Sequence, residues 1–381
     1  MLTTLAIANY RSLRDIVVPL RRLTVVTGAN GTGKSSLYRS LRLLADAARN
    51  GAVAALAYEG GLQSTLWAGP ETVGRSVRER RHPVQGTVRT KAVALRLGFA
   101  ADEYGYAIDF GLPRPSASKF ALDPEIKREC VWTGPVLRKA TLLADRHNGM
   151  VVLDDNGISI SLTDSMLSEL PMPELMIIRD RIRSWRFYDQ FRTDAHAPAR
   201  LARVGTRTPV LADDGGDLAA ALETIREVGD EDDLIKAVDD AFPGSRIDVE
   251  NVGGRFELRF HQHGLLRPLG ATELSDGTLR YLLWVAVLLT PRPPELLVLN
   301  EPETSLHPDL IAPLAALITT AATRTQLVMV SHNAILIRSL TAAAEQVGED
   351  IGLIELVKEF GETSVVGQGP LDGPSWQWPK R

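Results

Sequence analysis

Residues 24–36 read Thr24-Val25-Val26-Thr27-Gly28-Ala29-Asn30-Gly31-Thr32-Gly33-Lys34-Ser35-Ser36. The stretch predicts a short apolar strand, a glycine-rich turn and the start of a helix, and the turn matches the phosphate-loop pattern G-x-x-x-x-G-K-[ST]. Glycines let the backbone curl so that its N–H groups approach an anion, and the positive end of the helix faces the same point. A glycine-rich turn can fit the pattern by chance, but the order of strand, turn and helix favours a phosphate-binding loop.

The side chains of this loop suit a triphosphate bound with Mg²⁺. Lys34 can reach the β- and γ-phosphates as a point charge, and the Ser35 hydroxyl is placed to ligate Mg²⁺. We expect the nucleotide to be held by Gly28, Asn30, Gly31, Thr32, Gly33, Lys34, Ser35 and Ser36. The loop alone predicts only a nucleotide-binding protein, because phosphate loops are widespread.

The composition is that of an ordinary globular protein of 381 residues, with 44% hydrophobic and 24% charged residues, long enough for two domains. A net charge of −4 gives no overall electrostatic case for nucleic acid, so such a site would have to be a local patch. Cys130 is the only cysteine, so no disulfide can form within the chain, and this fits a reducing cytoplasm. We expect Cys130 to be a small buried residue. We see no signal peptide, and the longest apolar stretch is too short to cross a bilayer, so we expect a cytoplasmic protein without a membrane partner.

An α/β pattern occupies both ends of the chain. The N-terminal part predicts strands over 2–19 and 23–27, a helix over 35–49 and a hairpin over 88–112. The C-terminal part predicts a helix opening at Ser275, buried strands over 296–299 and 326–330, helices within 303–321 and from 335 onward, and a hairpin over 351–366.

The middle of the chain carries no motif of its own. Residues 113–149 have no assigned element; a hairpin is expected over 150–162, a helical pattern over 165–191, helices over 218–228 and 232–241, and strands over 247–260. We therefore expect an ATPase lobe over 1–112, an inserted α+β lobe of unknown role over 113–264, and a second ATPase lobe over 265–381.

Three further motifs follow the phosphate loop in order. Leu274-Ser275-Asp276-Gly277-Thr278 opens a helix, where a second phosphate could bind, although a serine N-cap would also explain it. The buried strand 296–299 ends in Asn300-Glu301-Pro302-Glu303, at the edge of a sheet where ligands sit, so Glu301 would polarise a water and Asn300 would hold the Mg²⁺ shell. The next buried strand ends in Ser331-His332-Asn333; a lone histidine is more often structural, but this order favours a γ-phosphate contact by His332.

Together these motifs resemble the ABC-type ATPases, over about residues 1–112 and 265–345. The resemblance implies a P-loop NTPase head with ATP and Mg²⁺ as ligands. It also implies a role for each motif: Walker A at 28–36, the signature at 274–278, Walker B at 296–301, the D-loop at 305–308 and the switch histidine at His332.

The branch of this family follows from three shorter stretches. Asn9-Tyr10-Arg11-Ser12-Leu13 and Asn30-Gly31-Thr32-Gly33-Lys34 resemble the RecF and SMC branch, which adds Arg11 as a nucleotide contact. Residues 301–308 are similar to those of overcoming-lysogenization-defect (OLD) and related stand-alone AAA-type predicted ATPases. The chain lacks the coiled coils of SMC proteins, so it resembles the stand-alone ATPases most.

Walker B departs from the usual pattern, because Asn300 stands where an aspartate is expected. Asparagine keeps an acceptor oxygen but loses the charge, which lowers the expected Mg²⁺ affinity and turnover. Glu303 could supply that charge, or it could be a first-turn carboxylate that meets a helix dipole; the sequence leaves both readings open.

In ABC ATPases, ATP is sandwiched between Walker A of one copy and the signature of the other, so the resemblance implies a homodimer in which Ser275 and Gly277 cap the γ-phosphate. One reading is an ATPase acting on DNA in repair or defence, with the arginines of 75–81 and 179–192 as contacts to the phosphate backbone. Those arginines can equally form a solvated face paired with Glu79, Asp180 and Asp189. A second reading is a weakly hydrolysing regulatory dimer that controls an effector protein, and a transporter subunit ranks last.

Overall fold

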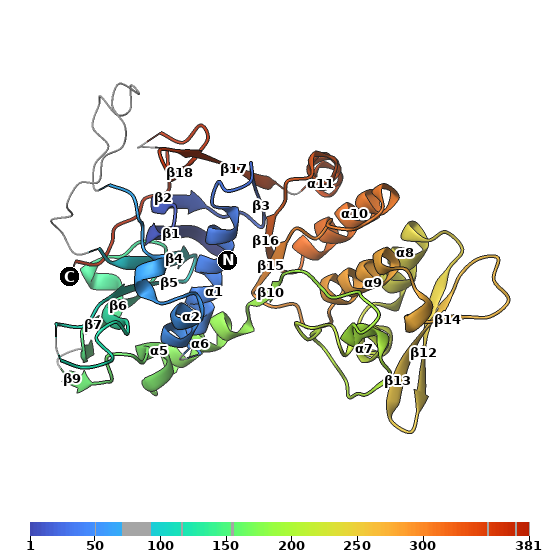
Figure 1. The fold of residues 1–381 in the computed structure, drawn as a ribbon, viewed down its shortest axis with the longest axis horizontal. Coiled ribbons are helices and arrows are strands. Elements are labelled where there is room, and N and C mark those ends of the chain that lie inside the picture. The colour runs from blue at the N-terminus through green and yellow to red at the C-terminus, as the bar shows by residue number, and fades with distance from the viewer. Residues whose placement is uncertain are drawn as a thin grey trace. The chain divides into compact units, whose positions relative to one another are not determined.

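The computed structural model describes residues 1–49, 51–70, 93–115, 117–153, 156–348, 350–369 and 372–380. The chain forms two compact units, one of Met1–Trp185 with Gly352–Arg381 and one of Arg186–Ile351 (Figure 1). These boundaries differ from 112 and 264, and the three-part division by function stays a prediction.

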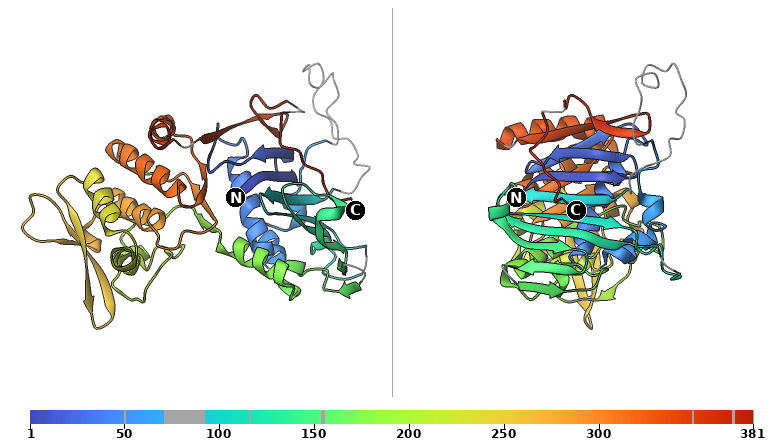
Figure 2. Two further views of the ribbon diagram at one scale, coloured as in Figure 1. Left: turned by 180° about the vertical axis from the view of Figure 1, so that it is seen from behind. Right: turned by 90° about the vertical axis from the view of Figure 1, so that its left-hand side faces the viewer.

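The first unit is built on an eight-stranded antiparallel sheet in the order β2-β1-β4-β5-β6-β7-β8-β9, whose strands are seen stacked in Figure 2. The strands are β1 (Leu2–Tyr10), β2 (Leu13–Pro19), β4 (Leu95–Ala101), β5 (Tyr104–Gly111), β6 (Glu125–Thr133), β7 (Leu142–His147), β8 (Met150–Leu153) and β9 (Asn156–Ser159). The pairs β4–β5 and β8–β9 confirm the hairpins predicted within 88–112 and 150–162, and the pair β1–β2 confirms the strands predicted over 2–19. Strands β6 and β7 lie where the sequence assigned no element.

A buried ion pair explains why β6 and β7 escaped prediction. Glu129 on β6 and Arg146 on β7 are both fully buried, 3.2 Å apart. Glu129 also accepts hydrogen bonds from Tyr106, Ser165 and the Met166 N–H, at 2.7, 2.5 and 2.9 Å. Charged side chains can be buried when they are paired and hydrogen-bonded in this way. In the sequence alone, however, such charged residues are typical of a segment that is exposed to solvent.

The helices of the first unit are α1 (Lys34–Ala47), α2 (Ala52–Tyr58), α3 (Leu62–Thr65), α5 (Met166–Glu169) and α6 (Pro173–Ser184), with the short 3₁₀ turn η1 (Lys139–Thr141). Helix α1 confirms the predicted helix and packs on β1 and β4, with α6 beside it (Figure 1). The helical pattern expected to run to residue 191 ends at Ser184, because Trp185 is extended and buried and a strand follows.

The remaining strands of this unit are β3 (Leu23–Gly28), β17 (Ile351–Glu359) and β18 (Glu362–Val365). Strand β3 is the predicted strand that feeds the phosphate loop, and it neighbours β17. Strands β17 and β18 form the predicted antiparallel hairpin, with Phe360 and Gly361 at positive φ in its turn.

The second unit contains three parallel strands in the order β10-β15-β16, which are β10 (Arg186–Tyr188), β15 (Leu296–Asn300) and β16 (Gln326–Val330). Its helices are α7 (Leu218–Val228), α8 (Glu231–Ala241), α9 (Asp276–Leu288), α10 (Ile311–Ala322) and α11 (Ala334–Val347). Strands β15 and β16 and helices α7, α8, α9 and α11 lie where the sequence predicted them. Helix α10 begins only at Ile311, after a turn in which Glu301 and Ser305 have positive φ and after the 3₁₀ turn η4 (Pro308–Leu310).

A small antiparallel sheet completes the second unit: β11 (Arg203–Val204), β12 (Arg246–Val252), β13 (Arg255–His261) and β14 (Leu269–Gly270), with the 3₁₀ turns η2 (Pro198–Arg200) and η3 (Ala271–Glu273). The pair β12–β13 confirms the predicted strands that break at Gly253-Gly254. The loop between β13 and β14 exposes the apolar side chains of Leu265 and Leu266. Among the residues that the structure describes, no helix has the length and apolar character that a membrane crossing needs.

Candidate functional site

The predicted phosphate loop follows β3 and leads into α1. Gly28, Gly31 and Gly33 have φ of 141°, 80° and 110°, backbone conformations that L side chains rarely adopt. A Cβ on Gly28 would lie 2.3 Å from the Leu356 carbonyl oxygen, and one on Gly33 would lie 2.7 Å from Thr363 Oγ1. The loop therefore needs glycine for its φ angles and for the close approach of the β17–β18 hairpin.

Hydrogen bonds from the side chains of Lys34 and Thr363 hold the backbone of this loop in place. Lys34 is buried, and its ammonium donates to the carbonyls of Gly28 and Ala29 at 2.7 and 3.1 Å. The Thr363 hydroxyl donates to the Thr32 carbonyl at 2.6 Å. Asn30, Gly31 and Ser35 are exposed, whereas Thr32 and Ser36 are buried.

The loop and α1 together suit a phosphate group. Helix α1 has 14 residues, Gly33 is its N-cap, and no side chain among the described residues caps its first N–H groups. Free N–H groups at the positive end of a helix bind anions, and the ammonium of Lys34 is close to the same turn. Residues 28–36, predicted to hold the phosphates, thus form the loop and the first turn of α1, whereas the other predicted contacts, Arg11, Ser275 and Gly277, belong to other segments.

Arg11 lies in the turn between β1 and β2, with a φ of 52°. Its guanidinium pairs with Glu59 at 2.8 Å, and the Tyr10 hydroxyl donates to the same carboxylate at 2.7 Å. Burial raises the pKa of Tyr10, and the hydrogen bond with Glu59 raises it further. The sequence did not indicate Glu59 as the partner of Arg11, because 48 positions separate the two residues.

The second group of predicted residues lies at the carboxyl end of β15 and β16. Asn300 pairs in register with Val330, and the Glu301 N–H donates to the Val330 carbonyl at 2.8 Å. Glu301 Oε1 lies 3.4 Å from Nδ1 of His332. The structure thus brings together Glu301 and His332, which the sequence placed at the ends of two buried strands. A carboxylate beside an imidazole at this edge of the sheet can orient a water molecule and accept a proton from it.

Glu303 is buried, and its Oε1 accepts a 2.5 Å hydrogen bond from the Ser331 hydroxyl. Its Oε2 is also buried and has no hydrogen-bond partner within the described residues. The reading of Glu303 as a first-turn helix carboxylate is wrong, because η4 and α10 begin several residues later. Its carboxylate instead joins the turn after β15 to the loop after β16.

Ser275 caps α9: its hydroxyl accepts the Thr278 N–H at 3.1 Å. The serine N-cap that the sequence left open is therefore present, and the side chain of Ser275 is exposed. An added Cβ on Gly277 would lie 3.6 Å from the Ser305 carbonyl oxygen, so α9 starts close to the turn that follows β15.

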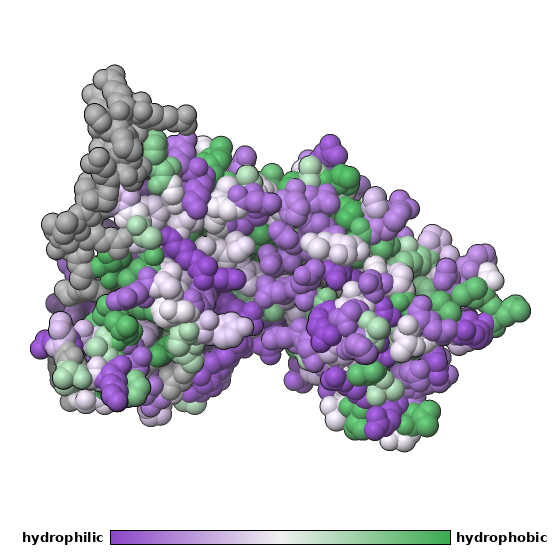
Figure 3. Space-filling view, viewed as in Figure 1, coloured by the Kyte–Doolittle hydropathy of each residue, from purple (hydrophilic) through white to green (hydrophobic). Residues whose placement is uncertain are grey.

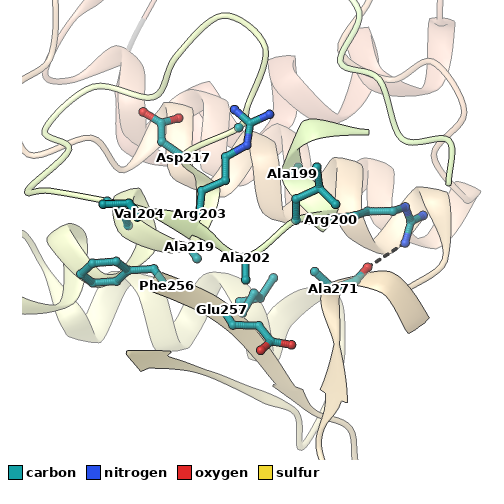
Figure 4. A pocket seen from close by; sticks show the side chains of 15 residues that line it. Ala199, Arg200, Ala202, Arg203, Val204, Asp217, Ala219, Phe256, Glu257 and Ala271 are labelled. Atoms are coloured by element: carbon teal, nitrogen blue, oxygen red, sulfur yellow. Dashed lines mark hydrogen bonds between the residues drawn. The ribbon is translucent and has the colours of Figure 1, made fainter. Parts of the chain in front are cut away.

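Two buried arginines, which the sequence did not indicate, hold this part of the second unit in place. Arg200 lines a small pocket of about 20 Å³ beside Ala271, to whose carbonyl it donates at 2.7 Å (Figure 4). It also donates to the Leu274 carbonyl and to Asp276, both at 2.8 Å, so it fixes the residues on either side of Ser275. Arg280 donates to the Thr304 carbonyl at 3.0 Å, and burial lowers its pKa.

The candidate DNA-contacting arginines are largely engaged where the structure describes them. Arg179 pairs with Asp180 at 3.3 Å, Arg181 with Glu103, and Arg192 with Asp194 at 2.9 Å. The alternative of a paired arginine face is supported for these side chains. Arg75, Arg78, Arg80 and Arg81 lie outside the described residues.

Comparison with known proteins decides the family. The sequence model of the family described as "AAA domain, putative AbiEii toxin, Type IV TA system" matches residues 23–338, most of the chain. The chain belongs to this family. Its AAA domain confirms the predicted resemblance to the stand-alone AAA-type ATPases. No curated protein matches the chain.

The fold of this AAA-family chain is similar to that of solved SMC heads. An SMC head bound to the C-terminal winged-helix domain of ScpA aligns with a TM-score of 0.53 at 13% identity, over 96% of this chain and 97% of that one. The SMC head of Thermotoga maritima gives 0.48 at 14% identity over 96% and 98%, and a head with an extended coiled coil from Pyrococcus furiosus gives 0.49 at 13% over 96% and 95%. The predicted mixed α/β P-loop NTPase fold is confirmed.

Membership in an ATPase family implies nucleotide binding, and the turn around Lys34 fits a triphosphate. Within the described residues, no group of three or more His, Cys, Asp and Glu side chains is arranged to hold a metal ion by itself. Mg²⁺ in phosphate-loop proteins is held largely by the nucleotide and water, with one or two protein ligands. Ser35 and Asn300 therefore stay the predicted protein ligands of Mg²⁺.

Proposed function

We propose that this AAA-family chain binds ATP with Mg²⁺, hydrolyses it, and is driven by ATP to form a homodimer. The observation that carries the proposal is the 3.4 Å approach of Glu301 and His332 at the carboxyl end of two parallel strands, next to Asn300. A carboxylate that orients a water and an imidazole that senses a γ-phosphate are the groups that such a hydrolysis needs.

In this proposal each residue has a separate task. The N–H groups of residues 28–36 and the ammonium of Lys34 bind the phosphates, and Arg11, held by Glu59, is a further contact to the nucleotide. Ser35 and Asn300 hold the Mg²⁺ shell, in which the metal neutralises developing charge on the phosphates. Glu301 orients the water, and His332 hydrogen-bonds the γ-phosphate. Ser275 and Gly277 of the other copy close over the same phosphate.

A second candidate is a weakly hydrolysing ATP-gated dimer that controls an effector protein. Asn300 favours it, because an amide carries no charge for the Mg²⁺ shell. Slow turnover would keep the ATP-bound dimer closed for longer, which suits a switch. An action on DNA, in repair or defence, rests on the resemblance alone, since the described arginines of 179–192 named above are engaged with carboxylates.

The test is phosphate release and molecular mass measured side by side, with and without ATP·Mg²⁺ and duplex DNA. Lys34→Ala should abolish nucleotide binding. Glu301→Gln should keep ATP-driven dimers while slowing turnover by about 10²–10⁴-fold. Asn300→Asp should raise turnover. Arg39→Ala, an exposed change on the same helix as Lys34, and Glu345→Gln, an exposed change on α11, serve as matched controls.

The outcomes separate the candidates. Turnover stimulated by DNA would establish a DNA-linked ATPase. Stable ATP-bound dimers with slow hydrolysis, indifferent to DNA, would establish the regulatory switch. A wild-type chain that binds no ATP would overturn the proposal.

A further inference from the structure

A groove of about 260 Å³ opens in the second unit between α7, α8 and β12. The buried side chains of Leu222, Leu234 and Val238 form its floor, and Ile235 stands at its rim with 56% of its surface exposed. Ile247 and Val249 of β12 complete its apolar lining. A concave apolar surface of this kind is typical of a site that receives an apolar side chain or ligand.

Negative charge is concentrated on the elements around this groove. Residues 218–250 contain ten Asp and Glu and three Lys and Arg, a net charge of −7, whereas the whole chain carries −4. All the other residues together are therefore positively charged, and the acidic character belongs to α7, α8 and the start of β12. Hydrophilic side chains gather over α7 in the view of Figure 3.

Three carboxylates, Glu223, Glu231 and Asp248, and two arginines line the groove itself. Arg226 lines the groove and donates to Asp248 and to Glu223, both at 2.8 Å. These hydrogen bonds raise the pKa of Arg226, and its single charge faces two carboxylates. Glu231 lines the groove at the first turn of α8 and lies next to Asp232 and Asp233. Arg246 is the other basic residue of the rim.

We propose that this groove docks a basic amphipathic helix of a partner protein. The apolar face of the helix would lie on Leu222, Leu234 and Val238, and its Lys or Arg side chains would face Glu231 and the carboxylates around Arg226. Helices bind grooves in this manner through apolar anchors on one face, and complementary charge at the rim selects the partner and speeds its approach.

The charge of the groove argues against other occupants. Nucleic acid would bring further negative charge to a surface that is already acidic. A second copy related by a two-fold axis would bring the same acidic face against itself, which costs energy through like-charge repulsion. A basic helix satisfies both the apolar floor and the acidic rim.

The test uses the full chain and a fluorescein-labelled peptide of Leu and Lys, about four helical turns long, with its leucines on one face. A peptide of the same composition but scrambled order keeps the charge and removes the apolar face. Fluorescence anisotropy at low salt should show saturable binding of the amphipathic peptide and weaker binding of the scrambled one. Both Ile235→Asp and Glu231→Lys should weaken the binding about tenfold.

Helix α6 offers matched controls outside the groove. Ile177 is 59% exposed on α6, against 56% for Ile235, and Glu174 lies in the first turn of α6 as Glu231 lies in the first turn of α8. Ile177→Asp and Glu174→Lys should leave the affinity for the peptide unchanged, since the same chemical changes are made there at exposed helix positions.

Three outcomes would overturn the proposal. The first is equal loss of affinity in the α6 controls, and the second is equal binding of the scrambled peptide, which would reduce the effect to charge alone. The third is self-association of the chain that Ile235→Asp abolishes, measured by sedimentation without peptide, which would make a second copy the occupant. The experiment needs no nucleotide, so its result is independent of the proposed ATPase activity.

Discussion

The hydroxyl of Ser331 donates a 2.5 Å hydrogen bond to Oε1 of Glu303, and both side chains are buried. This bond joins two loops that carry the candidate catalytic residues, because Glu303 follows Glu301 by two positions and Ser331 precedes His332. The Ser331 hydroxyl also accepts the Asn333 N–H at 3.1 Å. One hydroxyl therefore helps to set the spacing of Glu301 and His332.

Replacement of Ser331 by alanine should lower the free energy of unfolding by about 1–3 kcal/mol, because it leaves the buried carboxylate of Glu303 without its donor. If the chain hydrolyses ATP as proposed, kcat should fall more than KM rises, since the nucleotide-binding loop is untouched. Urea unfolding followed by tryptophan fluorescence, together with phosphate release, measures both effects.

The control is a double-mutant cycle with Glu303→Ala. A coupling energy of about 0.5–3 kcal/mol is expected for two side chains in contact. Additive losses from the two single changes would show that the hydrogen bond contributes nothing to stability. An unchanged kcat in Ser331→Ala would contradict its effect on the spacing of Glu301 and His332.

The phosphate-loop glycines should respond unequally to alanine. Gly28→Ala should abolish nucleotide binding and lower the thermal midpoint, because its Cβ would lie 2.3 Å from the Leu356 carbonyl oxygen. A Cβ on Gly31 would meet no atom of the described residues within 4 Å. Gly31→Ala should therefore lower the free energy of unfolding only through the strain of its positive φ, by about 1–2 kcal/mol. Thermal unfolding with and without ATP measures the difference, and equal losses in both variants would contradict the role of the β17–β18 hairpin.

The local features of the fold could be predicted from the sequence. The phosphate loop, strands β15 and β16 and helices α7 and α8 carry their own signals of apolar period, glycine and N-terminal polar residues, so their bounds follow closely from the residues. The sequence also placed Glu301 and His332 each at the end of a buried strand, but the 3.4 Å approach of their side chains comes from the parallel pairing of β15 and β16, which only the structure shows.

What could not be predicted depends on partners far away in the sequence. In the sequence, Glu129 and Arg146 are typical of residues exposed to solvent, whereas in the structure they form an ion pair in the core. Arg200 and Arg280 likewise give no local sign that they hold the carbonyls around Ser275 and Thr304. Buried arginines of this kind are specified by the packing of distant segments, which a single sequence does not display.

Arg200→Met should destabilise the second unit by about 2–4 kcal/mol, because the carbonyls of Ala271 and Leu274 lose charged donors in a buried site. The residues on both sides of Ser275 should become more mobile, and hydrogen exchange at the start of α9 should rise. Arg200→Lys keeps the charge but not the planar set of donors, so an intermediate effect is expected. Protection of α9 that is unchanged in Arg200→Met would contradict this role.

Cys130 offers a probe of the first unit. Its thiol is buried on β6, where it lies 3.2 Å from Asp145, and burial raises its pKa. The thiolate is the reactive form, so at pH 8 the folded chain should react with a disulfide reagent at least about a hundredfold more slowly than the urea-unfolded chain. Cys130→Ser supplies the blank. Because the chain has one cysteine, the slow rate reports the opening of β6 alone. Fast labelling of the folded chain would mean that β6 opens readily to solvent and would contradict the burial of this strand.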